Sequence, residues 1–351
     1  MKWIEWNPVP FGSSSGDFLP SSYSFGLSLL TLLLFLPLGL LGYFSPDLSL
    51  SIQLIPLYLS LFIFGMPHGG ADHLLIWGMI KESSWAFRIG TLLLYPSLSI
   101  LYLICWHFQP VASAVFFLAL TIFHWGQGDR YLSIKLHRAG YLLRSRFLST
   151  LHLLARGSLP ILLPGYLGND TYRAFLEAMV RQVANPENTD LSWISENPAF
   201  FLYVPAILLS VQLLLSFLFK NKGEGRPILI DLCEGVFLFA WFLVVPTIWA
   251  LGLYFALWHS LRHGLRILWL DDSGRTNLQN RAYLLVKARW LQLTSLMTIL
   301  ALIGLWLILS LPLHFQGIEL DWLGKAMLGI SILTLPHTVV VCLMDKFQGP
   351  I

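Results

Sequence analysis

Residues 247–270 read TIWALGLYFALWHSLRHGLRILWL, and this stretch decides the fold class. It is mostly apolar and long enough to cross the hydrocarbon core of a bilayer, which takes about 20 residues of helix. Two histidines, His259 and His263, lie inside it. A polar ring in hydrocarbon is costly unless it is paired, so each is a functional candidate. The stretch therefore predicts a membrane helix that carries part of a site.

The composition of the whole chain agrees with a membrane protein. Of 351 residues, 56% are hydrophobic and only 12% are charged, whereas a soluble domain carries about 25% charged residues. The net charge is +3 and the basic residues are scattered, which argues against nucleic acid as a partner. The three cysteines are isolated, and we interpret them as small hydrophobic residues.

Ten apolar runs are candidates for transmembrane helices, so we expect an all-α, polytopic integral membrane bundle of about ten helices (8–10). A polar N-terminal segment, 1–22, precedes a single transmembrane helical catalytic domain, 23–345. No small-residue cleavage site follows the first run, so it is predicted to be a retained helix. The runs lie near 23–44, 51–80, 85–106, 110–128, 147–167, 199–219, 228–246, 247–270, 290–313 and 322–344.

The distribution of Lys and Arg predicts the orientation, because these residues favour the cytoplasmic side. With ten spans and a cytoplasmic start, segments 81–88, 130–146, 220–226 and 262–289, together with Lys2 and Lys346, hold 18 of the 22 Lys and Arg residues. We therefore expect a multi-pass protein of the cell (inner) membrane with both termini cytoplasmic. The one sizeable external segment, 168–198, has apolar residues at helical spacing. This pattern predicts a helix that lies in the membrane interface or packs onto the bundle.

Histidines from several predicted spans fall at one depth. His124, His259, His263 and His337 lie about twelve to sixteen residues from the outer ends of their spans, and His68 about seventeen, which at 1.5 Å per residue forms one layer. His259 and His263, at i and i+4, share a helix face, an arrangement that suits a transition metal. The alternative for each single histidine is an interhelical hydrogen bond. Imidazole suits Zn, Cu, Fe or Ni.

Other residues near these histidines are candidates for auxiliary roles. Asp72 and Asp129 could orient ring N–H groups, or instead cap helices or pair with Arg130 or Arg262. His73, five residues after His68, is expected on another helix face. The glycines after His68 and His124, at 69–70 and at 126 and 128, are predicted to interrupt helices beside a cavity. Small-residue helix packing is the alternative interpretation.

Four motifs resemble the signature stretches of the Brp/Blh family of carotenoid-cleaving dioxygenases. They are PHGGAD at 67–72, FHWGQGD at 123–129, HSLRH at 259–263 and LPH at 335–337, and the similarity covers about residues 60–345. The resemblance implies an integral membrane, Fe²⁺-dependent β-carotene 15,15′-dioxygenase that makes retinal. It also implies that His68, His124, His259 and His263 bind the iron. His337 matches a motif histidine that the family does not count as a ligand, and Trp125 stands where the family often has Phe.

The implied reaction is oxidative cleavage of the central double bond of β-carotene or a related carotenoid by O₂. Because such a substrate dissolves only in lipid, we expect it to enter sideways between helices. Trp125, Tyr254 and Trp258 are predicted to line its site, and a functional link to a retinal-binding opsin is a further expectation.

Two other functions stay open at this point. The first is a membrane di-iron hydroxylase or desaturase, which also uses histidine-rich motifs, although this chain has no adjacent histidine pair. The second is a non-enzymatic transporter that moves a metal or protons through the histidine layer; transporters often carry inverted repeats, and we detect none.

Overall fold

The computed structural model describes residues 21–45, 48–79, 84–183, 190–310 and 321–347. Helices make up nearly all of these residues, and no β-strand occurs among them. The all-α fold class predicted from the sequence is confirmed. The helices, with π-helices labelled η, are α1 (Ser21–Phe44), α2 (Leu50–Leu59), η1 (Ser60–Gly65), α3 (Met66–Gly70), α4 (Asp72–Met79), α5 (Trp85–Phe108), α6 (Pro110–Lys135), α7 (Tyr141–Arg144), α8 (Arg146–Leu162), α9 (Pro164–Leu167), α10 (Asn169–Val180), α11 (Ser192–Glu196), α12 (Pro198–Leu218), α13 (Gly225–Val244), α14 (Thr247–Leu253), η3 (Tyr254–Ser260), α15 (Leu261–Leu270), α16 (Asp272–Gln279), α17 (Tyr283–Ser310) and α18 (Asp321–Phe347).

Eight of the helical segments in the described chain are long and apolar enough to cross a membrane. This number is the lower end of the predicted range of eight to ten. The first predicted span, 23–44, corresponds to α1. The stretch 247–270 forms α14, η3 and α15 without a break. It is not among the eight apolar segments, because polar residues such as Arg262 and Arg266 lower its mean hydropathy.

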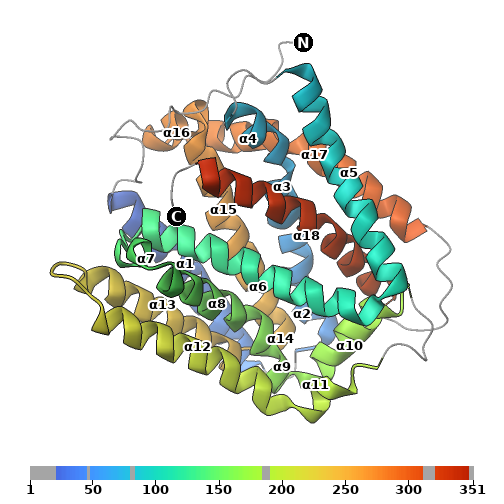
Figure 1. The fold of residues 1–351 in the computed structure, drawn as a ribbon, viewed down its shortest axis with the longest axis horizontal. Coiled ribbons are helices and arrows are strands. Elements are labelled where there is room, and N and C mark those ends of the chain that lie inside the picture. The colour runs from blue at the N-terminus through green and yellow to red at the C-terminus, as the bar shows by residue number, and fades with distance from the viewer. Residues whose placement is uncertain (1–20, 46–47, 80–83, 184–189, 311–320, 348–351) are drawn as a thin grey trace.

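Burial separates inner helices from outer ones. In Figure 1, α12 and α13 run side by side along the lower edge and α5 lies along the upper right, whereas α6, α8 and α15 lie between them. In the most apolar window of the α8 segment, 78% of residues are buried, against 11% for α5 and 22% for α17. The outer helices present leucine and isoleucine side chains outward, as a lipid-facing surface requires.

Helix α6 is continuous through Gly126 and Gly128, so the predicted interruption of the helix there is wrong. Gly126 instead allows α6 and α8 to approach closely: a Cβ atom on it would lie 1.9 Å from the carbonyl oxygen of Leu153. Gly157 on α8 is the matching position, since its Cβ would lie 1.9 Å from the carbonyl oxygen of Ile122. Small residues that let two membrane helices touch explain both glycines.

The interruption predicted at glycines 69–70, next to Pro67, is present. The segment 50–79 is divided into α2, η1, α3 and α4, with a turn at Ala71. Proline has no N–H to donate to the preceding turn, and here a π-helical stretch, η1, precedes it. A second π-helix, η3, contacts η1 and carries His259. π-Helical turns are rare and often mark functional sites.

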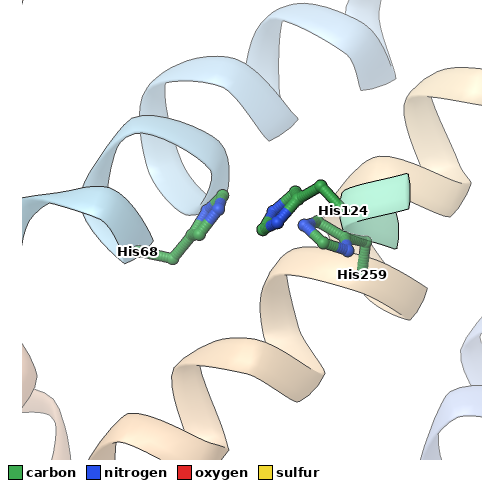
Figure 2. Close-up of side chains that lie close together, drawn as sticks. All are labelled: His68, His124 and His259. Atoms are coloured by element: carbon green, nitrogen blue, oxygen red, sulfur yellow. The ribbon is translucent and has the colours of Figure 1, made fainter. Parts of the chain in front are cut away.

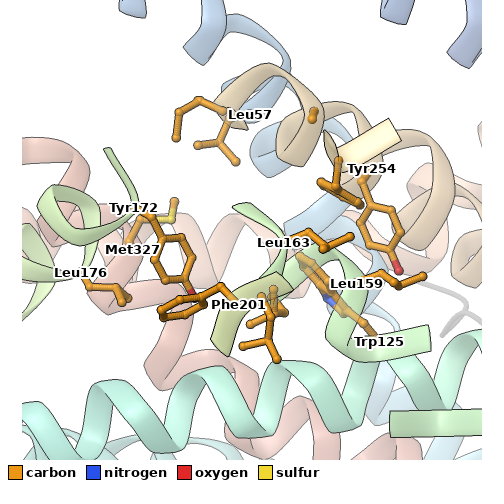
Figure 3. Packing of buried hydrophobic residues seen from close by; sticks show 14 of the residues in the cluster. Leu57, Trp125, Leu159, Leu163, Tyr172, Leu176, Phe201, Tyr254 and Met327 are labelled. Carbon is orange, nitrogen blue, oxygen red and sulfur yellow. The ribbon is translucent and has the colours of Figure 1, made fainter. Parts of the chain in front are cut away.

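Within the segment 168–198, helix α10 packs onto the bundle. Helix α10 lies against α18, and Tyr172, Leu176 and Met179 on it are buried. Figure 3 shows Tyr172 and Leu176 beside Met327 of α18 and Phe201 of α12. This contact supports packing onto the bundle for α10; residues 184–189 lie outside the described chain. The N-terminal segment 1–22 also lies outside it, except for Ser21 and Ser22 at the start of α1.

The orientation in the membrane stays a prediction. Two of the basic residues that supported it, which were expected in a cytoplasmic segment, are buried inside the bundle. Arg262 and Arg266 are buried in α15 and form ion pairs with Glu234 and Asp345. They are therefore internal charges and not loop charges, and they carry less weight as orientation signals.

Candidate metal centre

Five buried histidines from separate parts of the chain converge inside the bundle. The ring centroids of His68 and His259 are 5.4 Å apart, and those of His124 and His259 are 4.9 Å apart. One nitrogen from each of His68, His124 and His259 lies within 4.8 Å of the others. These three rings approach one another from α3, α6 and η3 (Figure 2).

The remaining two rings complete the group. His263 lies one turn beyond His259, with ring centroids 6.3 Å apart and an interplanar angle of 16°. Its ring is 5.2 Å from that of His68. His337 of α18 lies 4.8 Å from His68 and 4.7 Å from His124. The structure thus brings together the four histidines expected to bind metal and the fifth, which was expected to be auxiliary.

Nitrogen atoms of four of these rings, those other than His68, suit a metal centre. Both nitrogens of His124 and the Nε2 atoms of His259, His263 and His337 are buried without a hydrogen-bond partner. A buried polar atom left unpaired costs about 1–3 kcal/mol. A neutral imidazole has one N–H donor and one acceptor nitrogen. Acceptor nitrogens from several rings can share a transition metal ion.

Asp72 is the carboxylate that one of these rings contacts. His337 Nδ1 lies 2.7 Å from Asp72 Oδ2, and the hydroxyl of Tyr95 on α5 donates to the same oxygen. The predicted role of Asp72 as an orienting group therefore has a geometric basis. Tyr95 was missed, because a lone tyrosine in an apolar helix carries no signal in the sequence.

Asp129 and His73 have partners other than the clustered histidines. Asp129 accepts hydrogen bonds from Arg156 Nε at 3.1 Å and from Trp258 Nε1 at 3.0 Å. It supports His259 only indirectly, by fixing the neighbouring Trp258. The ring of His73 packs edge-on against Trp77 instead, at 5.1 Å, in agreement with its expected position on another helix face.

A charged network lies beside the histidines. Arg156 Nη2 donates to Glu234 at 2.7 Å, and Arg262 donates to the other oxygen of Glu234 at 3.0 Å. The guanidinium of Arg262 also stacks on the Trp258 ring at 3.6 Å. With Asp129, this network has two positive and two negative groups, so it brings no net charge to the site. Its pairing was not predictable, because Arg156 and Glu234 are far apart in the sequence.

Aromatic side chains form the wall beside His259. The Trp125 ring lies 5.5 Å from that of His259 and 5.1 Å from that of Tyr254. Figure 3 shows Trp125 and Tyr254 together with Leu159 and Leu163. Trp258 has a different environment, because its indole is held between Asp129 and Arg262. A small cavity borders the cluster and is lined by Gly128, Asp129, Tyr131, Leu132, Trp258, His259, Arg262, His263 and Arg266.

Fold and site together define a class: a polytopic helical membrane protein with an imidazole-rich centre buried between its helices. Comparison with known proteins then gives the family. The family model described as Beta-carotene 15,15′-dioxygenase matches residues 59–345, and this chain belongs to that family. The matched region includes all five histidines.

Individual relatives agree with the family. The chain is 32% identical to the probable beta-carotene 15,15′-dioxygenase Blh of Halobacterium salinarum, over 86% of this chain and 87% of that protein. It is 32% identical to the probable beta-carotene 15,15′-dioxygenase Brp of the same species over 37% of this chain and 39% of the relative. It is 34% identical to the Beta-carotene 15,15′-dioxygenase of uncultured marine bacterium 66A03 over 20% of this chain and 26% of that protein. No solved structure matches the chain.

Proposed function

We propose that this protein cleaves the central 15,15′ double bond of β-carotene or a related carotenoid with O₂ at a histidine-bound Fe²⁺, giving retinal. The observation that carries the proposal is the convergence of buried imidazole rings from separate helices, with nitrogens of His124, His259 and His263 that have no hydrogen-bond partner. Membership of the dioxygenase family supplies the reaction. His68, His124, His259 and His263 are the proposed ligands.

The iron would supply the activation of O₂, and the surrounding side chains would position the histidine ligands and exclude water. The rings of His259 and His263 are parallel and one turn apart, so a single helix face fixes both of them. Trp258, bound to Asp129 and stacked on Arg262, holds this turn in place. Burial of the whole group keeps water away from the reacting double bond.

The substrate is proposed to come from the lipid. A carotenoid is almost insoluble in water, and the outer helices present an apolar surface to the bilayer. Trp125 and Tyr254 beside His259 offer flat apolar faces that suit a polyene. We propose that the protein acts in the cell membrane with both termini cytoplasmic, and that the retinal formed serves a retinal-binding opsin.

A retinal assay tests this function. Membranes from cells that express the protein are incubated with β-carotene in air and under nitrogen, and retinal is measured by chromatography. We expect retinal in air only, and its loss in His259→Ala. His107→Ala is the matched control, because His107 is exposed and lies outside the cluster. A correctly folded, iron-loaded protein that forms no retinal would overturn the proposal, and equal retinal formation by His259→Ala would overturn the site.

A further inference from the structure

His337 is as close to three of the other rings as the four proposed ligands are to one another. Its ring centroid lies 4.7 Å from that of His124, 4.8 Å from that of His68 and 5.6 Å from that of His263. For comparison, the centroids of His124 and His263 are 6.4 Å apart. Helix α18 therefore delivers a fifth imidazole to the same space.

The hydrogen bonds of His337 decide which of its nitrogens is available. Its Nδ1 lies 2.7 Å from Asp72 Oδ2, and an ionised carboxylate only accepts hydrogen bonds. The tautomer with its proton on Nδ1 satisfies this contact and leaves the lone pair on Nε2. This Nε2 atom is buried and has no hydrogen-bond partner. A carboxylate that holds the far nitrogen of a histidine is the usual support of a metal ligand.

Tyr95 fixes the carboxylate in turn. Its hydroxyl donates to the oxygen of Asp72 that also bonds His337, so three helices, α5, α4 and α18, are linked in one chain. The other carboxylates around the site are bound to arginines: Asp129 to Arg156, and Asp345 to Arg266. Asp72 instead bonds to Tyr95 and His337.

We propose that His337 is a fifth metal ligand, binding through Nε2, and that Asp72 and Tyr95 are its positioning residues. This inference rests on the proposed metal centre and adds a ligand to it. A role limited to an interhelical hydrogen bond would account for Nδ1 but would leave Nε2 buried and unpaired. Ligation accounts for both nitrogens.

Cobalt(II) binding to the purified, metal-free protein in detergent tests the proposal without relying on turnover. Cobalt(II) has visible absorption bands whose intensity and position change with the number and type of ligands. We expect His337→Ala to change this spectrum and to weaken cobalt binding at least 100-fold, and added imidazole to restore the spectrum. Asp72→Asn should weaken binding about 10–100-fold, Tyr95→Phe less, and both should retain most of the wild-type spectrum.

The controls separate this inference from the function on which it rests. His107→Ala should bind cobalt as the wild type does, and His259→Ala should lose binding. If His259→Ala loses the metal while His337→Ala keeps the wild-type affinity and spectrum, His337 is not a ligand and the proposed function stands. If the wild-type protein binds neither cobalt nor iron, both proposals fail. If His337→Ala does not fold, the affinities of Asp72→Asn and Tyr95→Phe decide, and wild-type affinity in both contradicts the positioning role.

Discussion

Gly126→Ala is the substitution that most directly links the packing of this protein to its site. The added methyl carbon would lie 1.9 Å from the carbonyl oxygen of Leu153, whereas real Cβ contacts are essentially never shorter than 3.0 Å. Neither clashing atom can rotate away, because the Cβ is fixed to the backbone of α6 and the carbonyl oxygen belongs to the backbone of α8. Helices α6 and α8 must therefore move apart by about 1 Å. Overpacking of this kind costs about 1–3 kcal/mol of stability.

The displacement also reaches the metal centre. His124 lies two residues before Gly126 on the same helix, so its ring moves with α6 relative to His68 and His259. A misplacement of about 1 Å near a reacting centre can reduce the rate about 100-fold. Retinal formation per mole of purified protein and the unfolding midpoint in detergent measure the two effects.

The control is Gly304→Ala on α17, where an added Cβ meets no atom within 4 Å. It should leave retinal formation unchanged and alter stability by no more than about 1 kcal/mol, the usual difference between Gly and Ala in a helix. Wild-type turnover and stability in Gly126→Ala would refute the conclusion that the α6–α8 contact sets the position of His124.

Three further predictions concern the surroundings of the centre. Arg156→Met leaves the buried Asp129 without its cation and should cost about 3–5 kcal/mol in chemical unfolding; an unchanged midpoint would contradict the network. Trp125→Phe should keep the iron content and change the relative rates on different carotenoids; identical rates on all of them would exclude this ring from the substrate site. Arg144 donates two hydrogen bonds that lower the pKa of Glu224. Glu224→Gln should therefore reduce stability at pH values above the ordinary carboxyl pKa of about 4.3. The difference in stability between variant and wild type should vanish as the pH falls through the lowered pKa of Glu224. A difference in unfolding midpoint that does not depend on pH would count against the ion pair.

The helices and the common depth of the histidines could be predicted from the sequence, because both follow from local patterns. Apolar runs of fixed length define the spans, and the distance of His68, His124, His259 and His337 from the ends of their spans sets their depth. The pair at 259 and 263 shares a face because of helix geometry alone. These features require no knowledge of which helices are neighbours.

Features that depend on the neighbours of each helix were not predictable. The role of Gly126 could not be decided, since the same residue can break a helix or let another backbone approach, and only the position of Leu153 distinguishes the two. Tyr95 becomes relevant only because α5 packs beside Asp72, and the same holds for the pairing of Arg156 with Glu234. The π-helix at 254–260 had no signal in the sequence, because the residue types there also form ordinary α-helix.

Imidazole rings from separate helices are proposed to hold one iron ion that the reaction requires. The most direct measurement is elemental analysis of purified, retinal-forming protein, compared with the single alanine variants of His68, His124, His259 and His263. We expect about one iron per wild-type chain, little or no iron in each variant, and turnover that follows the iron content. Retinal formation by a wild-type preparation free of transition metals would contradict the iron requirement.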